Sequence, residues 1–287
     1  MSSINQTIKL SGGLVYWNLQ RFSEIFPLII NWTGTEAQEF IPNQMDPQAA
    51  LKCAMQDRLV TRGEGLYPLK GNGFALVKEN SKQDDVEFNT ILTGQVGAVD
   101  GGLLTFKGRT RFLSIEERFT IEDEYVKMIN RASNQRLAFS LVGLISKLKG
   151  VAMRHRGGMY WLHESKLEAW EKAVSVLPQA GSRNETYIIR HSVDTDSAKA
   201  ILAAVTHEMD SQAQQLCTAI GSGKLGDRAL ASKTAEADAA IGKLEWYENL
   251  LGASLDKARE NLKQVKVASA QGNLNGINLD LSFMEDM

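Results

Sequence analysis

Cysteine and proline are both scarce in this 287-residue chain. The two cysteines, Cys53 and Cys217, stand far apart, so the sequence predicts no disulfide framework and fits a reducing compartment. Four of the five prolines precede residue 70, and none follows Pro178. Because proline interrupts helices, this asymmetry predicts a turn-rich first part and a helix-rich last part.

Long apolar runs are absent as well. The longest, such as Phe26–Ile30 and Leu141–Ile145, fall far short of the roughly 20 residues that span a bilayer. The first ten residues lack a basic segment followed by an apolar core, so they do not read as a signal peptide. We therefore expect a cytoplasmic protein that makes no use of a membrane.

The motifs of common active sites are also missing. His207 and Glu208 begin like a zinc-protease motif, but Ser211 stands where the second histidine is needed. The segment Gly221–Gly226 resembles a phosphate loop, yet it has Thr218 and Leu225 at two required positions. The sequence therefore predicts no catalytic residue, no metal site and no cofactor, while an enzyme with a scattered site stays open.

The composition is that of a globular protein, with 43% apolar and 23% charged residues. Residues 1–190 favour a mixed region, with strands near 13–17, 65–70 and 73–78. A helix begins after Asp46, which is a favourable N-cap before a proline. Together with the helix-rich last part, this pattern predicts an α+β fold.

The last hundred residues predict a long antiparallel helical hairpin over 194–267, followed by a flexible tail over 268–287. One helix is expected from Asp194 to about Ile220 and a second from Gly226 to Val267. The apolar residues of the second helix follow the alternating three- and four-residue spacing of a coiled coil, with Glu248 and Ala258 filling two of the core positions. They are Ile241, Leu244, Leu251, Leu255, Leu262 and Val265.

The apolar seam of this hairpin has two interpretations. The second helix packs on the first, or the hairpin projects and docks another subunit. The polar Glu248 in a core position and an exposed aromatic pair favour the docking interpretation, because aromatic side chains often anchor interfaces. The candidate partner-binding residues are Ile241, Leu244, Trp246, Tyr247, Leu251 and Leu255.

One segment lacks negative charge, although the net charge of the whole chain is −2. No acidic residue lies between Tyr125 and Arg156, and the basic side chains there could neutralise phosphates while an aromatic ring stacks on a base. The alternative is a basic helix face paired with the acids of 116–124 or with an acidic partner. The candidate nucleic-acid-binding residues are Lys127, Arg131, Arg136, Lys147, Lys149, Arg154, Arg156 and Tyr160.

Five short segments together resemble a family of uncharacterised proteins found in phages and bacteria, known only as a domain of unknown function. They are Ala49–Leu51, Leu66–Lys70, Gly73–Val77, Arg156–Leu162 and Lys243–Gly252. The resemblance spans most of the chain but transfers no functional residue. It implies a phage or mobile-element setting, hence the host cytoplasm, and a role beside an ATPase or in DNA transactions.

Three functional hypotheses follow. The first is a non-enzymatic binding or assembly protein whose hairpin engages copies of itself or a partner protein, possibly an ATPase. The second is a nucleic-acid-binding protein that uses the basic stretch over 127–156. The third is an enzyme whose site is assembled from scattered residues.

Overall fold

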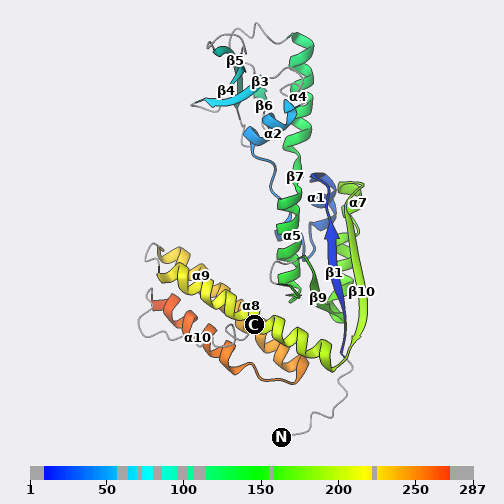
Figure 1. Cartoon of the computed structure of the whole chain (residues 1–287), viewed down its shortest axis with the longest axis vertical. Coiled ribbons are helices and arrows are strands. Elements are labelled where there is room, and N and C mark those ends of the chain that lie inside the picture. Colours follow the sequence, from blue (N-terminus) through cyan, green and yellow to red (C-terminus); the bar gives the residue numbers. More distant parts are fainter. Residues whose placement is uncertain are drawn as a thin grey trace. The chain divides into compact units, whose positions relative to one another are not determined.

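The computed structural model describes residues 10–56, 64–69, 73–79, 86–95, 103–105, 114–154, 158–221 and 225–271. It has the expected α+β fold (Figure 1). The chain forms two compact units. The bundle unit comprises Met1–Trp17, Gly143–Val174 and Thr186–Met287, and the meander unit comprises Asn18–Val142 and Ser175–Glu185. The chain passes back and forth between them, so the units do not follow a single boundary near residue 190.

The meander unit contains an antiparallel sheet in the order β3-β4-β5-β6. The expected hairpin is present, since Gly65 pairs with Val77 and Leu69 with Gly73. These strands are β3 (Glu64–Leu69), β4 (Gly73–Glu79), β5 (Val86–Gln95) and β6 (Leu103–Thr105). A separate pair joins β2 (Phe22–Glu24) to β7 (Arg131–Ser133).

The helices of the meander unit are short except for two. Asp46 caps α2 (Pro47–Ala54), as the sequence predicts, by accepting the Ala49 N–H at 3.1 Å. The apolar faces of α2 and α4 (Ile115–Ile129) share a core around Leu51 and Tyr125. The remaining elements are α1 (Phe26–Trp32), a 3-10 helix (Gln38–Phe40), α7 (Leu177–Ala180) and most of α5 (Asn134–Lys147).

The buried side-chain amide of Asn184 links the first residues of the meander unit to its last segment by hydrogen bonds. The Asn184 side chain accepts the Gln20 N–H at 3.0 Å and donates to the Ser23 hydroxyl at 2.9 Å and the Leu177 carbonyl at 3.2 Å. Asn184 and Ser23 are at most 1% exposed. A buried amide is stabilising only when its groups are paired, so this network fixes how 18–24 and 175–185 meet.

The bundle unit combines a four-stranded sheet with α6 (Glu164–Val174) and with the three helices of the last hundred residues. The sheet order is β10-β1-β9-β8, and Gly12 comes so close to the Trp161 ring that a Cβ there would clash. One face of the sheet packs on α6 through Leu167, which lies against Gly13. The strands are β1 (Leu10–Asn18), β8 (Val151–Ala152), β9 (Tyr160–His163) and β10 (Glu185–Val193).

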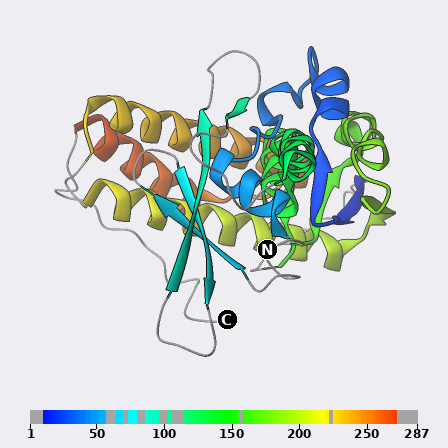
Figure 2. The ribbon, with the colours of Figure 1, turned by 90° about the horizontal axis from the view of Figure 1, so that it is seen from above.

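The three helices are α8 (Thr195–Gly221), α9 (Asp227–Leu251) and α10 (Asp256–Gln271), and they lie side by side in both views (Figure 1, Figure 2). The predicted continuous helix over 226–267 is therefore wrong, because it is two helices that share one core with α8. Residues 268–271 complete α10, with Ala268 3% exposed, so they are not part of a flexible tail. Residues 272–287 lie outside the described residues.

Two local features break the expected helix. Gly252 adopts φ 62°, a left-handed conformation that glycine tolerates best and that commonly ends helices. Glu248, the polar residue in a core position, accepts the Leu255 N–H at 2.7 Å and pairs with Arg259. The Glu248 carboxylate thus caps the start of α10. This role explains why a polar residue stands in the apolar pattern, and no partner protein is needed to explain it.

Candidate functional site

The long helix α8 has two different faces. One face repeats apolar residues at three- and four-residue intervals and is buried against α9 and α10, including Val205 and Met209 at 0% exposure. A neighbouring face carries small and polar side chains instead and forms the floor of an open cleft of about 530 Å³. That face consists of Ala200, Ala203, Ala204, His207, Glu208, Ser211, Gln212 and Gln215, and the buried Leu216 completes the lining from α8.

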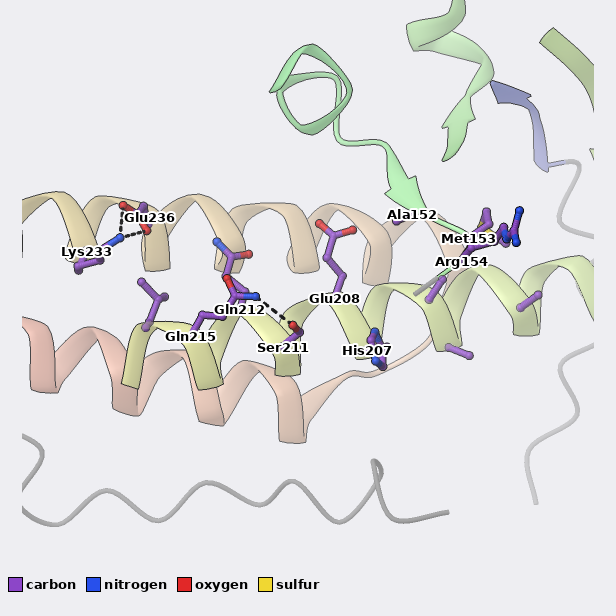
Figure 3. A pocket seen from close by; sticks show the side chains of 14 residues that line it. Ala152, Met153, Arg154, His207, Glu208, Ser211, Gln212, Gln215, Lys233 and Glu236 are labelled. Atoms are coloured by element: carbon purple, nitrogen blue, oxygen red, sulfur yellow. Dashed lines mark hydrogen bonds and ion pairs between the residues drawn. The ribbon is translucent and has the colours of Figure 1, made fainter. Parts of the chain in front are cut away.

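Elements on two sides complete this cleft, which we call the α8 cleft. Ala152, Met153 and Arg154, at and after β8, lie at one end, and Lys233 and Glu236 of α9 lie at the other (Figure 3). Lys233 and Glu236 form an ion pair at 2.8 Å. With a helical rise of about 1.5 Å per residue, the floor from Ala200 to Leu216 is roughly 24 Å long. The cleft is therefore an elongated groove.

Glu208 is the central charge of the α8 cleft, and a buried lysine holds its carboxylate in place. Its carboxylate lies 2.5 Å from the Lys243 ammonium, which also donates to the Gly150 carbonyl at 2.5 Å. The Lys243 side chain is 8% exposed and that of Glu208 is 30% exposed. The buried ammonium thus fixes a carboxylate that water or a ligand can still reach.

The ionisable groups around Glu208 are perturbed by burial and by its charge. Burial lowers the pKa of Lys243, although the charge of Glu208 and the hydrogen bond to it act in the opposite direction. Burial raises the pKa of Tyr247 well above its ordinary value, and Glu208 raises it further. The pKa of Tyr160 is also raised, chiefly by burial. Both phenols are therefore neutral at physiological pH.

Arg154 has a different environment from the other charges of the cleft. It is exposed, and within the described part of the chain no hydrogen bond or ion pair engages its guanidinium. Lys233 and Glu208 each have an internal partner. The end of the α8 cleft at Arg154 therefore carries a positive charge that is available to an anionic group.

The candidate residues of the basic stretch divide between the two compact units, and those of the meander unit are described first. Lys127 pairs with Glu124 at 2.7 Å, and Arg136 donates to the backbone carbonyls of 43 and 44. These residues belong to the meander unit, with Arg131, which is half-buried beside the Met128 sulfur. Lys127 and Arg136 are therefore already engaged by groups of the same unit.

The remaining candidates of the basic stretch belong to the bundle unit. Lys149 donates to the Gly242 carbonyl at 3.2 Å and lies 5.7 Å from the Trp246 ring centre. Tyr160 is 8% exposed and stacks on Trp17, so its ring is a core contact. Lys147 is exposed in the last turn of α5, and Arg154 faces the cleft. Arg156 lies outside the described residues.

The predicted partner-binding residues form the core of the bundle. Leu244 and Tyr247 are 0% exposed, and Trp246 is only partly exposed because it packs against Tyr247 and His163. The prediction of an exposed aromatic pair is therefore wrong for Tyr247. Leu251 and Leu255 are 8% exposed in the same core, against which Ile241 also packs. The apolar seam is used for self-packing.

Sequence reasoning missed the α8 cleft. Glu208 and Lys243 are 35 positions apart, and no periodicity connects them. The signal in the sequence is the polar second face of α8, on which His207 and Glu208 lie. In the described ranges, no group of three or more His, Cys, Asp or Glu side chains could hold a metal ion. No helix of the described part is long and apolar enough to cross a membrane.

Comparison with known proteins gives a family and nothing finer. No curated protein and no solved structure matches the chain. A family model does match, from residue 29 to residue 275, which covers both compact units. The chain therefore belongs to the family of unknown function DUF6744.

Proposed function

We propose that this chain is a non-enzymatic binding and assembly protein whose α8 cleft receives a segment of a partner protein. The observation that carries the proposal is the exposed guanidinium of Arg154 at the end of a groove that follows four turns of α8. A carboxylate on the incoming segment would pair with Arg154 in the bidentate geometry that arginine favours. The phage or mobile-element setting and the cytoplasmic location belong to this proposal.

The shape and chemistry of the groove support a protein segment as the occupant. A length of roughly 24 Å corresponds to about seven extended residues or four helical turns. The alanines at positions 200, 203 and 204 let a backbone come close, while Ser211, Gln212 and Gln215 offer donors and acceptors for its polar groups. The negative charge of Glu208 would repel an acidic side chain at the middle of the incoming segment.

The test is capture of partners from the native host with matched variants of the full chain. Ser211→Trp fills the cleft and Arg154→Glu reverses its charge, so both should abolish capture of the specific partner. Gln214→Trp and Arg228→Glu make the same changes at exposed positions of α8 and α9 outside the cleft, and should leave capture intact. A partner that all five proteins capture equally would refute the proposal.

The same unpaired Arg154 favours nucleic-acid binding as a second candidate function, because a guanidinium also pairs with phosphate. Most other cations of the basic stretch already have protein partners, so this candidate depends on Arg154 together with Arg156. Fluorescence anisotropy with a labelled single-stranded oligonucleotide tests it. Binding should weaken steeply with salt and disappear in Arg154→Glu/Arg156→Glu. Equal binding by that variant would exclude the candidate.

A further inference from the structure

β10 is an edge strand with an exposed apolar side. In the described part of the chain its only strand neighbour is β1, so the backbone N–H and C=O groups along its other edge face away from the sheet. Tyr187 and Ile189 alternate along one face of the strand and are 40% and 51% exposed. Such edges readily accept another strand, and proline or lysine, which usually blocks this, is absent from β10.

A segment with the matching pattern follows α10. Residues 277–283, which lie outside the described residues, read Ile-Asn-Leu-Asp-Leu-Ser-Phe. Apolar and polar residues alternate without exception, and this period of two predicts an amphipathic strand. The five residues before it are rich in glycine and asparagine, as in a linker.

The segment cannot reach β10 of its own chain. α10 runs antiparallel to α9, since Arg259 pairs with Glu248 and Lys266 with Asp238, and therefore runs parallel to α8. β10 ends beside the start of α8, whereas α10 ends toward the far end of the bundle (Figure 1).

The lengths make this separation quantitative. Asn261 of α10 lies level with Asp210 of α8, at 3.4 Å between their side chains. At about 1.5 Å per residue, Gln271 then lies roughly 37 Å along the bundle from Thr195. Six residue steps from Gln271 to Ile277 span at most about 22 Å when fully extended.

We propose that residues 277–283 of one copy add as a strand to the β10 edge of a second copy. The backbone groups of the edge then find partners, and the apolar residues of the segment extend the exposed side of Tyr187 and Ile189. Asn278, Asp280 and Ser282 fall on the opposite face, where Arg190 lies. Reciprocal exchange closes a dimer, and head-to-tail exchange builds a longer assembly. The proposal is independent of the α8 cleft.

The first test measures the mass of the full chain by light scattering over a range of concentrations. The wild-type protein should self-associate, and Leu279→Asp/Leu281→Asp should be monomeric. Asn278→Asp/Ser282→Asp adds the same two charges to the other face of the segment and should still associate. On the edge itself, Ile189→Lys should weaken association at least tenfold, whereas Ser192→Lys should not.

A second measurement separates the possible occupants of the edge. A labelled peptide of residues 272–287 should bind the Leu279→Asp/Leu281→Asp protein and lose at least tenfold in affinity when Ile189→Lys is added. A monomeric wild-type chain that also fails to bind the peptide would overturn the proposal. Association that Ile189→Lys removes but the segment variants retain would mean that β10 pairs with β10 of another copy, which would also overturn it.

Discussion

Lys243→Met tests whether the buried ammonium holds the floor of the α8 cleft together. Methionine has a similar length and apolar stem, so the packing of α9 is largely kept while the charge and its hydrogen bonds are removed. Two groups then lose their donor, namely the Glu208 carboxylate and the Gly150 carbonyl.

The expected loss can be worked out from burial. Removing one partner of a fully buried pair costs about 3–5 kcal/mol. Because the Glu208 side chain is 30% exposed, water replaces part of the lost interaction, and we expect a loss of about 2–3 kcal/mol in the free energy of unfolding. For a chain of 287 residues, that corresponds to a decrease in Tm of about 3–5 °C.

The assay is urea and thermal unfolding followed by far-ultraviolet circular dichroism at neutral pH. Lys243→Met/Glu208→Gln removes both charges and should recover to within about 1 kcal/mol of the wild-type protein. Lys199→Met, which breaks the exposed pair with Asp196, is the control and should cost less than about 0.5 kcal/mol. If Lys243→Met costs no more than Lys199→Met, or if the double variant is as unstable as the single one, the reasoning is wrong.

The same variant carries a pH signature. Burial lowers the pKa of Lys243 below its ordinary 10.5, so in the window between the lowered value and 10.5 the unfolded state binds more protons. The free energy of unfolding therefore gains a contribution that rises with pH in that window. The stability difference between the wild-type protein and Lys243→Met should increase with pH there. The contribution of Tyr247 is present in both proteins and cancels.

Three further predictions use the same unfolding measurements. Gly252→Ala should lower the free energy of unfolding by about 1 kcal/mol, because φ is 62° at that position. Gly242→Ala within α9 should raise it by roughly 0.5–1 kcal/mol, because alanine favours a helix more than glycine does. Neither new methyl group meets an atom within 4 Å, so equal effects of the two substitutions would contradict the backbone argument. Asn184→Ala should cost about 2–3 kcal/mol, since it leaves buried groups of the meander unit unpaired. Tyr247→Phe should cost about 1–2 kcal/mol through the lost 2.7 Å hydrogen bond to the Lys149 carbonyl, and an unchanged stability would mean that this bond contributes nothing.

Local patterns predicted the elements that depend on near neighbours. The Asp46 cap and the turn after Leu69 each involve a few consecutive residues, so composition and spacing were sufficient for α2 and for the β3–β4 hairpin. The spacing from Leu244 to Val265 correctly identified side chains that are buried. It did not reveal that Gly252 divides them between two helices, because apolar periodicity continues across a break that keeps both helices on one core.

The candidate site was less accessible to sequence reasoning for a physical reason. A run of basic residues predicts a basic surface, yet Lys127, Arg136 and Lys149 each bind a different group of the chain itself. The α8 cleft arises where residues from β8, α8 and α9 meet, and only packing brings them together.

The sequence by itself determined the fold class, the buried apolar pattern from Leu244 to Val265 and the helix-rich character of the last hundred residues, since these follow from periodicity and from the placement of proline and glycine. Only the tertiary structure decided that the apolar seam is buried in a three-helix core, that Glu248 caps α10, and that Glu208 forms an ion pair with Lys243. Periodicity tells which face of a helix avoids water, but not which surface will cover it. That choice depends on contacts between residues far apart in the chain.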